Sequence, residues 1–267
     1  MSKLYIIFLL LIANNIQAQK IDSIPVNLGI SSSKPEFYLN NKLTEINDSR
    51  KKLKALIIPG AMIAYGVISL ESDALQELDY KFKEEIWTEN QHNTIKIDNY
   101  LQYAPAVSVY ALNALGIKGK NNFRDRTLIY LTASTMMGIT VESLKTATKS
   151  QRPDGGANAF PSGHTASAFV AAEFLRQEYK SISPWIGVAG YAMATMTAYL
   201  RMYNNKHWFS DLLPAAGIGI LSTRAAYWIY PAIKRKLFRN KPMNTIVMPY
   251  YHKGNAGVSL TYNFHKD

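Results

Sequence analysis

The sequence has no cysteine among its 267 residues, which excludes disulfide bonds, thiolate metal sites and a cysteine nucleophile. Acidic residues are also scarce, since 19 Asp and Glu stand against 30 Lys and Arg and leave a formal net charge of +11. This balance favours anionic partners such as phosphate esters, acidic lipid surfaces or nucleic acid, although a solvated basic surface would produce it too. No Lys/Arg-rich run interleaved with aromatics is present, which argues against a nucleic-acid partner.

The first residues are typical of a targeting segment. Lys3 precedes the apolar run Leu4–Ala13, and a polar stretch then ends at Ala18. This order predicts a secretory signal peptide over residues 1–18, with an uncleaved anchor as the alternative. The run is shorter than the roughly 20 residues of a membrane span. We therefore expect the mature chain in the cell envelope, beyond the cytoplasm.

The rest of the chain falls into three parts. Residues 19–50 are polar and contain Pro25 and Pro35, so we expect a linker or a loosely ordered arm. Residues 51–241 hold apolar stretches whose lengths and Ala, Leu and Met content favour helices over strands. These stretches are Ala55–Leu70, Asn99–Ile117, Thr127–Val141, His164–Ala172, Ser181–Leu200 and Leu212–Thr223. They predict an all-α domain, a bundle of about six main helices.

The third part, residues 242–267, changes character. Thr245–Tyr251 is β-prone, Gly254–Gly257 is turn-like, and Val258–Phe264 alternates between apolar and polar side chains. This pattern predicts a short C-terminal β-hairpin packed on the helical body. The alternation is also typical of an outer-membrane barrel strand, but a barrel needs many such strands and this chain has two.

The apolar stretches leave open whether the bundle is soluble or lies in a membrane. Their modest length and the mean hydropathy of −0.11 suit a soluble bundle or short spans packed through small residues. Three basic connections fall at the end opposite the chemical motifs, which is the positive-inside pattern for a site facing the periplasm. A cleaved signal peptide starts the mature chain outside the cytoplasm, and counting every stretch as a span from there would place the site inside. The periplasmic orientation therefore requires one stretch, most plausibly Ala55–Leu70, to lie on the surface or fail to cross. We favour a membrane-associated or integral protein, with a soluble periplasmic enzyme as the alternative.

The first of three chemical motifs is basic. Lys145 and Arg152 stand seven positions apart, and Pro153 follows as a helix-ending residue. Taken alone, these residues are best interpreted as part of a solvated basic loop.

The second motif, Ser162-Gly163-His164, opens an Ala-rich helix. The free N–H groups and the dipole of a helix start form an anion site. Ser162 would add a hydroxyl donor or act as a plain N-cap, and Gly163 lets the backbone approach closely. A lone His164 in a first turn would be structural.

The third motif contains Arg201, His207 and Asp211. His207 and Asp211 stand four apart and share a face if the segment is helical. The carboxylate can then hold one imidazole N–H, which suits a histidine nucleophile.

Together the motifs supply three cations, an anion-binding helix start and two histidines in different surroundings. Phosphoryl transfer needs this inventory, because charge on the phosphate oxygens must be neutralised while a nucleophile and an acid are aligned. No cluster of carboxylates accompanies the motifs, so we expect no metal site and no cofactor.

The combined pattern resembles a known family. It runs Lys145-x6-Arg152-Pro153, then Pro161-Ser162-Gly163-His164, then Arg201-x5-His207-x3-Asp211. It is similar to the three-part signature of the type 2 phosphatidic acid phosphatase superfamily, which includes bacterial class A acid phosphatases and vanadium haloperoxidases. The resemblance covers about residues 99–230 and departs from the family at Leu200, where serine is usual.

The resemblance implies a role for each motif residue. His207 would attack phosphorus and form a phosphohistidine, Asp211 would orient it, and His164 would protonate the leaving group. The phosphate-binding residues would be Lys145, Arg152, Ser162, Gly163 and Arg201.

We therefore predict a metal-independent phosphatase acting on a phosphomonoester or diphosphate of a membrane lipid. The alternatives are a soluble periplasmic acid phosphatase of broad specificity that takes small phosphate esters, and a vanadate-dependent haloperoxidase. A scaffold with a vestigial site is disfavoured because every chemically required position is occupied.

Overall fold

The structure is a computed structural model that describes residues 35–90, 92–238, 245–252 and 255–262. The predicted signal peptide lies outside these residues. The chain divides into two compact units between Arg50 and Lys51.

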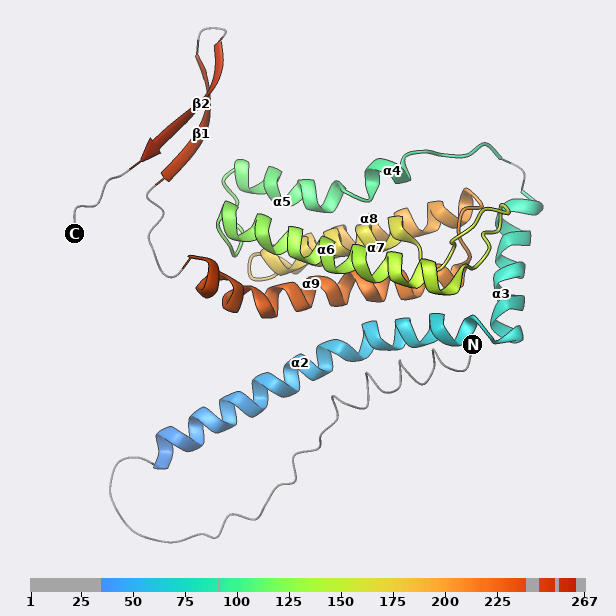
Figure 1. The fold of residues 1–267 in the computed structure, drawn as a ribbon, viewed down its shortest axis with the longest axis horizontal. Coiled ribbons are helices and arrows are strands. Elements are labelled where there is room, and N and C mark those ends of the chain that lie inside the picture. Colours follow the sequence, from blue (N-terminus) through green and yellow to red (C-terminus); the bar gives the residue numbers. More distant parts are fainter. Residues whose placement is uncertain (1–34, 91, 239–244, 253–254, 263–267) are drawn as a thin grey trace. The chain divides into compact units, whose positions relative to one another are not determined.

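The described residues are mostly helical, as predicted, with eight α-helices and one π-helical turn (Figure 1). The helices are α2 (Pro35–Ser69), α3 (Asp73–Lys83), α4 (Asp98–Leu101), α5 (Ala104–Ala114), α6 (Phe123–Thr148), α7 (Gly163–Tyr179), α8 (Pro184–Tyr203) and α9 (Phe209–Phe238), and the π-helical turn is η1 (Glu84–Thr88). Two strands, β1 (Thr245–His252) and β2 (Asn255–Tyr262), pair antiparallel, with Val247 opposite Leu260.

Three details differ from the sequence-based expectations. The predicted arm is helical from Pro35 onward, where the fixed backbone angle of proline suits a first helical turn. The segment between Ser72 and Asp98, for which no helix was predicted, forms α3 and η1. The apolar stretch that begins at Asn99 is interrupted before Pro105 and gives the separate helices α4 and α5. The number of helices therefore exceeds the expected six.

Helix boundaries follow local capping signals. The Asn122 side chain accepts the N–H of Asp125 at the start of α6, and Ser183 caps α8 just before Pro184. At the other end of α6, Lys149 adopts a left-handed conformation with φ of 49°, and its N–H bonds to the Lys145 carbonyl. These signals place the ends of the long helices, and with them the motifs.

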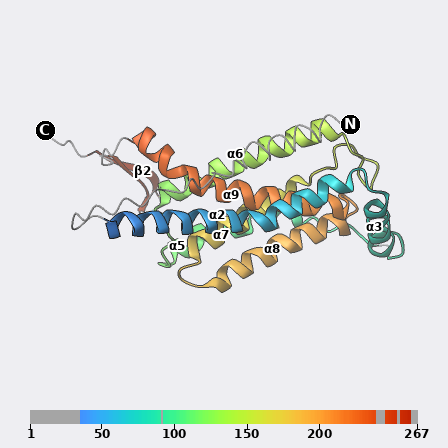
Figure 2. The ribbon, with the colours of Figure 1, turned by 90° about the horizontal axis from the view of Figure 1, so that it is seen from below.

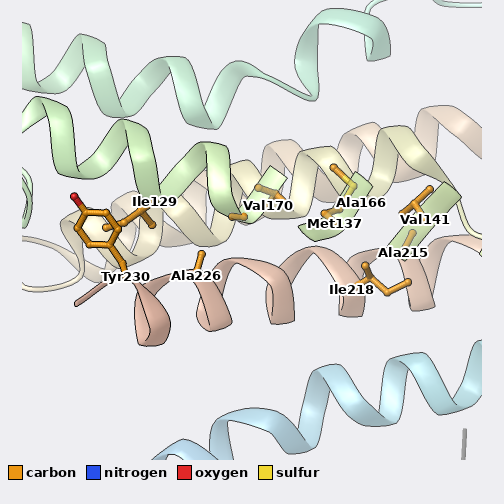
Figure 3. Close-up of a cluster of buried hydrophobic side chains, with 10 residues drawn as sticks. Ile129, Met137, Val141, Ala166, Val170, Ala215, Ile218, Ala226 and Tyr230 are labelled. Carbon is orange, nitrogen blue, oxygen red and sulfur yellow. The ribbon is translucent and has the colours of Figure 1, made fainter. Parts of the chain in front are cut away.

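Helix α7 is the centre of the bundle and packs against α5, α6, α8 and α9. In Figure 2, α6 and α8 lie on opposite flanks of α7. Figure 3 shows part of the core, a cluster that includes Ile129 and Val141 of α6, Val170 of α7 and Ile218 of α9. The backbones of α7 and α9 approach closely, since a Cβ atom at Gly219 would lie 2.5 Å from the carbonyl oxygen of Ala166.

The basic connections gather at one end of the bundle, as predicted. Lys234 near the end of α9 binds Asp125 at the start of α6 at 2.6 Å. Asn121, which precedes α6, donates to Glu178 at the end of α7. The opposite end holds the C-termini of α6 and α8 and the N-termini of α7 and α9, where the three motifs lie.

Candidate active site

All eight predicted site residues lie at this second end of the bundle. Lys145 lies in the last turn of α6, and Arg152 follows in the connection to α7. Ser162 and Gly163 begin α7, with His164 in its first turn. Arg201 lies near the end of α8, and His207 and Asp211 flank the first residue of α9. The backbone N–H of Ser162 donates to the Asp211 carbonyl at 3.2 Å, which joins the second motif to the third.

His207 and Asp211 form a buried pair. The distance from His207 Nδ1 to Asp211 Oδ2 is 3.3 Å, and the side chains are 2% and 3% exposed. The contact does not come from a shared helix face, because His207 lies before α9 begins. Instead His207 contacts Asp211 from the segment just before α9, where the Trp208 N–H also donates to Asp211 Oδ2 at 2.9 Å. A carboxylate acceptor at Nδ1 favours the tautomer with hydrogen on Nδ1, which leaves the Nε2 lone pair free.

The surroundings keep His207 neutral. Burial holds its pKa well below the usual range, and the charges of Arg201, Arg152 and Lys145 act in the same direction. Burial also raises the pKa of Asp211 to about 7, although the hydrogen bond from the Trp208 N–H and the nearby cations lower it. A neutral imidazole next to three cations can act as a nucleophile towards an anionic group.

The three cations are held in place but keep unused donors. Lys145 Nζ donates to the Asn158 carbonyl at 2.6 Å. Among the described residues, the buried Nε atoms of Arg152 and Arg201 have no hydrogen-bond partner. A buried unsatisfied donor costs about 1–3 kcal/mol. A bound oxyanion that accepted from these donors would remove this cost.

Ser162 is the N-cap of α7. Its Oγ accepts from the Thr165 N–H at 3.4 Å and from Thr165 Oγ1 at 3.0 Å. Both contacts use Ser162 as an acceptor, so its own hydroxyl hydrogen is left to donate. The two roles considered for this residue, N-cap and phosphate donor, are therefore compatible.

His164 is half-buried and lies beside the cations. Burial and then the charge of Arg201 lower its pKa to about 4, while Asp98 acts in the opposite direction. Its Nε2 lies 3.0 Å from Asn99 Oδ1. In the absence of a bound anion, His164 is neutral at physiological pH.

Two residues of α4 that contact the site were not predicted from the sequence. Asp98 is 1% exposed, and its Oδ2 accepts from Arg201 Nη1 at 2.6 Å. Asn99, the next residue, holds the ring of His164. Adjacent residues of one short helix thus fix a cation and a histidine. The one local signal was a polar Asp-Asn pair at the start of an apolar stretch.

A cavity of about 240 Å³ lies beside the pair and is lined in part by Arg152, Asp211, Trp208 and Tyr80. Helix α3 forms one wall, where Asp79 accepts from the N–H of Ser210 at 2.9 Å and supports the first turn of α9. Within the part of the chain that the structure describes, no group of three or more His, Cys, Asp or Glu side chains is arranged to hold a metal ion.

Comparison with known proteins gives a family match and one curated relative. The model of the PAP2 superfamily matches residues 139–235, which include all three motifs. A lipid A 1-phosphatase from Porphyromonas gingivalis is 41% identical over 142 residues, which are 52% of this chain and 32% of the relative. The chain therefore spans about a third of the length of that relative.

Two solved structures are also similar. The crystal structure of LpxE from Aquifex aeolicus has 23% identity and a TM-score of 0.43, and the match covers 57% of this chain and 95% of that one. A transmembrane PAP2 type phosphatidylglycerolphosphate phosphatase from Bacillus subtilis has 20% identity and a TM-score of 0.48, covering 69% and 99%.

Proposed function

We propose that the protein is a phosphatase with a histidine nucleophile, on the basis of the three motifs and of the match of residues 139–235 to the PAP2 superfamily. Its substrate would be a phosphomonoester or diphosphate of a membrane lipid, hydrolysed without a metal ion. The observation that carries this proposal is the buried His207–Asp211 pair next to three cations, two of which keep unpaired buried donors.

In the first step, His207 Nε2 attacks phosphorus. The bond from phosphorus to the leaving oxygen breaks, and its electron pair goes to that oxygen. His164, protonated once the anion is bound, donates a proton to the leaving group. Asp211 accepts from the Nδ1–H of His207 and stabilises the positive charge that develops on the phosphorylated ring.

The cations act on the non-bridging oxygens. Lys145, Arg152 and Arg201 neutralise the charge that these oxygens carry in the transition state. The Ser162 hydroxyl and the Gly163 N–H add hydrogen bonds at the start of α7, where the helix dipole also favours an anion. Apart from Arg152, these groups lie at helix ends, so little reorganisation of them is needed during the reaction.

In the second step, water attacks the phosphohistidine. His164, now neutral, takes a proton from the water as the oxygen–phosphorus bond forms. The bond between nitrogen and phosphorus breaks, inorganic phosphate leaves, and His207 returns to its neutral state. The same histidine therefore serves as acid and then as base.

Two observations support a lipid substrate and membrane association. The curated relative is named a lipid A 1-phosphatase. Large apolar side chains are also exposed on several helices, and these include Ile57, Ile58, Val107, Leu131, Ile139, Trp185, Val188 and Met196. Among the described residues, one segment, Lys52–Ser69, is long and apolar enough to span a membrane. This segment overlaps Ala55–Leu70, the stretch that the positive-inside orientation requires to lie on the membrane surface or to fail to cross.

A soluble periplasmic acid phosphatase is the second candidate, favoured by the mean hydropathy of −0.11 and by that single candidate span. Extraction separates the two. A protein released from broken cells by buffer alone is the soluble enzyme, and one that requires detergent is the membrane enzyme.

The activity itself is tested by phosphate release from a panel of lipid phosphates and soluble phosphate esters, with a chelator present throughout. We expect lipid phosphates to be preferred and the chelator to have no effect. Lys145→Gln should lower kcat/KM by about 100-fold or more, whereas Lys149→Gln, an exposed lysine four residues on, serves as the matched control. Equal loss in both variants, or activity restored only by added metal, contradicts the proposal.

A further inference from the structure

A groove lies between α7 and α8, at the end of the bundle away from the motifs. Its volume is about 560 Å³. Arg176 and Lys180 line it from the end of α7, and the remaining lining residues come from α8: Pro184, Gly187, Val188, Tyr191, Ala192 and Thr195. The groove is thus basic at one end and mainly apolar along its length. None of these residues has a role in the proposed reaction.

Gly187 shapes the basic end. A Cβ atom at this position would lie 2.7 Å from Cγ of Arg176. The absence of a side chain lets the stem of Arg176 pack directly on α8. Its guanidinium is fixed by two bonds to Glu173, from Nε at 2.7 Å and from Nη2 at 2.6 Å. Arg176 is therefore an ordered part of the groove wall.

Positive charge is in surplus at this end. The buried carboxylate next to the groove, Glu173, is shared by Arg176 and Arg224, whose Nε lies 2.9 Å from it. The hydroxyl of Tyr191 also donates to Glu173, which leaves this carboxylate with little capacity for a further cation. Lys180 adds another charge, and its pKa is lowered by partial desolvation and then by the charge of Arg176. A bound anion would relieve this repulsion.

The apolar length of the groove is an outward stripe of α8. Pro184, Val188, Ala192 and Thr195 follow one another at helical spacing and are all exposed. Val188 alone is 54% exposed. An extended hydrocarbon chain could lie along this stripe while a negative group meets the basic end.

We propose that this groove binds an anionic phospholipid, with its phosphate at Arg176 and Lys180 and an acyl chain along α8. Charge complementarity selects the head group, because a zwitterionic lipid adds a cation to a cluster that is already positive. The basic end is also the end that the positive-inside pattern places at the cytoplasm, where anionic lipids are abundant. The site rests on the proposed membrane association but is independent of the phosphatase chemistry.

Native mass spectrometry of the detergent-purified full chain tests the site, with phosphatidylglycerol and phosphatidylcholine added in equal amounts. We expect phosphatidylglycerol to be retained in preference. Lys180→Gln should reduce that retention about fivefold, while Lys118→Gln, an exposed lysine at the same end but outside the groove, should not. Ala192→Phe should obstruct the acyl path, with Ala189→Phe on the same helix as its control. Phosphatase activity should be unchanged in all four variants.

Several results would overturn this inference. One is equal retention of the two lipids, and another is equal loss in Lys180→Gln and Lys118→Gln, which would indicate surface charge alone. Displacement by glycerol phosphate at the same concentration would mean that the acyl chain contributes nothing. If the protein is a dimer in solution and Ala192→Phe makes it a monomer, the groove binds a second copy of the chain and not a lipid. A purified protein that retains the lipid but has no phosphatase activity would contradict the phosphatase proposal and leave the lipid site standing.

Discussion

At the scale of single residues, the proposed mechanism requires His164 to donate a proton, although its pKa in the free site is about 4. A bound phosphate brings negative charge next to the ring and offsets Arg201 and Arg152. Because an opposite charge favours the protonated imidazole, we expect the pKa of His164 to rise when inorganic phosphate or vanadate binds. Histidine NMR titration with and without the anion measures this, with the resonance assigned from a His164→Gln protein. An unchanged or lowered pKa would remove His164 from the role of acid.

Asn99 is a positioning residue for the same ring. Asn99→Ala should lower kcat by about 10- to 100-fold with little change in KM, because the ring loses its orientation while the phosphate contacts remain. Asn99→Asp keeps an oxygen at the contact and adds a negative charge, which favours the protonated ring. It should therefore recover part of kcat and move the alkaline limb of the pH profile upward. If both variants lower kcat equally without moving the profile, Asn99 has only a structural role.

The motif residues could be picked out from the sequence because each motif is short. The residue types that its chemistry needs stand within a few positions of one another. Asp98 and Asn99 could not be picked out in this way, since their partners are distant in sequence. Asp98 lies 103 positions from Arg201, and Asn99 lies 65 from His164. No local pattern connects residues so far apart. The His207–Asp211 contact was anticipated, but spacing alone does not reveal that His207 lies before α9 or that the Trp208 N–H also donates to Asp211.

At the scale of elements, the close approach of α7 and α9 holds the second and third motifs together. Gly219→Ala would place a methyl group 2.5 Å from a backbone carbonyl of α7. Since a backbone cannot yield as a flexible side chain does, the helices must separate, at a cost of about 1–3 kcal/mol. We expect a lower Tm and a matching loss of kcat.

Gly138 of α6 provides the control, because nothing lies within 4 Å of a Cβ atom there. Gly138→Ala should raise stability by about 0.5–1 kcal/mol through helix propensity alone. Thermal unfolding compares the Tm of each variant with that of the parent protein. Similar Tm changes of the same sign in both would mean that the α7–α9 contact is looser than described.

The long helices were predictable from apolar stretches, caps and prolines, but α3 was not. Its sequence is charged, and its value to the fold comes from Asp79, which binds Ser210 at the start of α9. The sequence alone does not distinguish a buried aspartate from an exposed one in a charged segment, because its hydrogen-bond partner is distant in the chain. The interruption between α4 and α5 was similarly hidden inside one apolar stretch.

At the scale of the whole molecule, the motifs and the basic connections lie at opposite ends of the bundle. If the bundle lies in a bilayer, the positive-inside pattern predicts the site in the periplasm and the groove between α7 and α8 at the cytoplasm. The absence of cysteine makes the orientation measurable. We expect Lys149→Cys, near the motifs, to react with a membrane-impermeant maleimide in spheroplasts, and Lys118→Cys to react only after lysis.

Reaction of Lys118→Cys alone in spheroplasts would reverse the orientation. Labelling of both variants, with protein released by buffer, would instead establish the soluble periplasmic enzyme. Neither the number of crossings nor the substrate follows from the motifs, because they recognise phosphate and the rest of the substrate is selected elsewhere.

The central claim is that His207 carries the phosphoryl group, and rapid quenching tests it most directly. The enzyme is mixed with a labelled phosphate substrate in chelator, stopped in alkali within one turnover, and analysed by tandem mass spectrometry. The account predicts phosphate on His207, lost on brief acid treatment, absent from His207→Gln and persistent in His164→Ala, where its hydrolysis is slowed. Turnover retained by His207→Gln, or a covalent phosphate on any other residue, would contradict it.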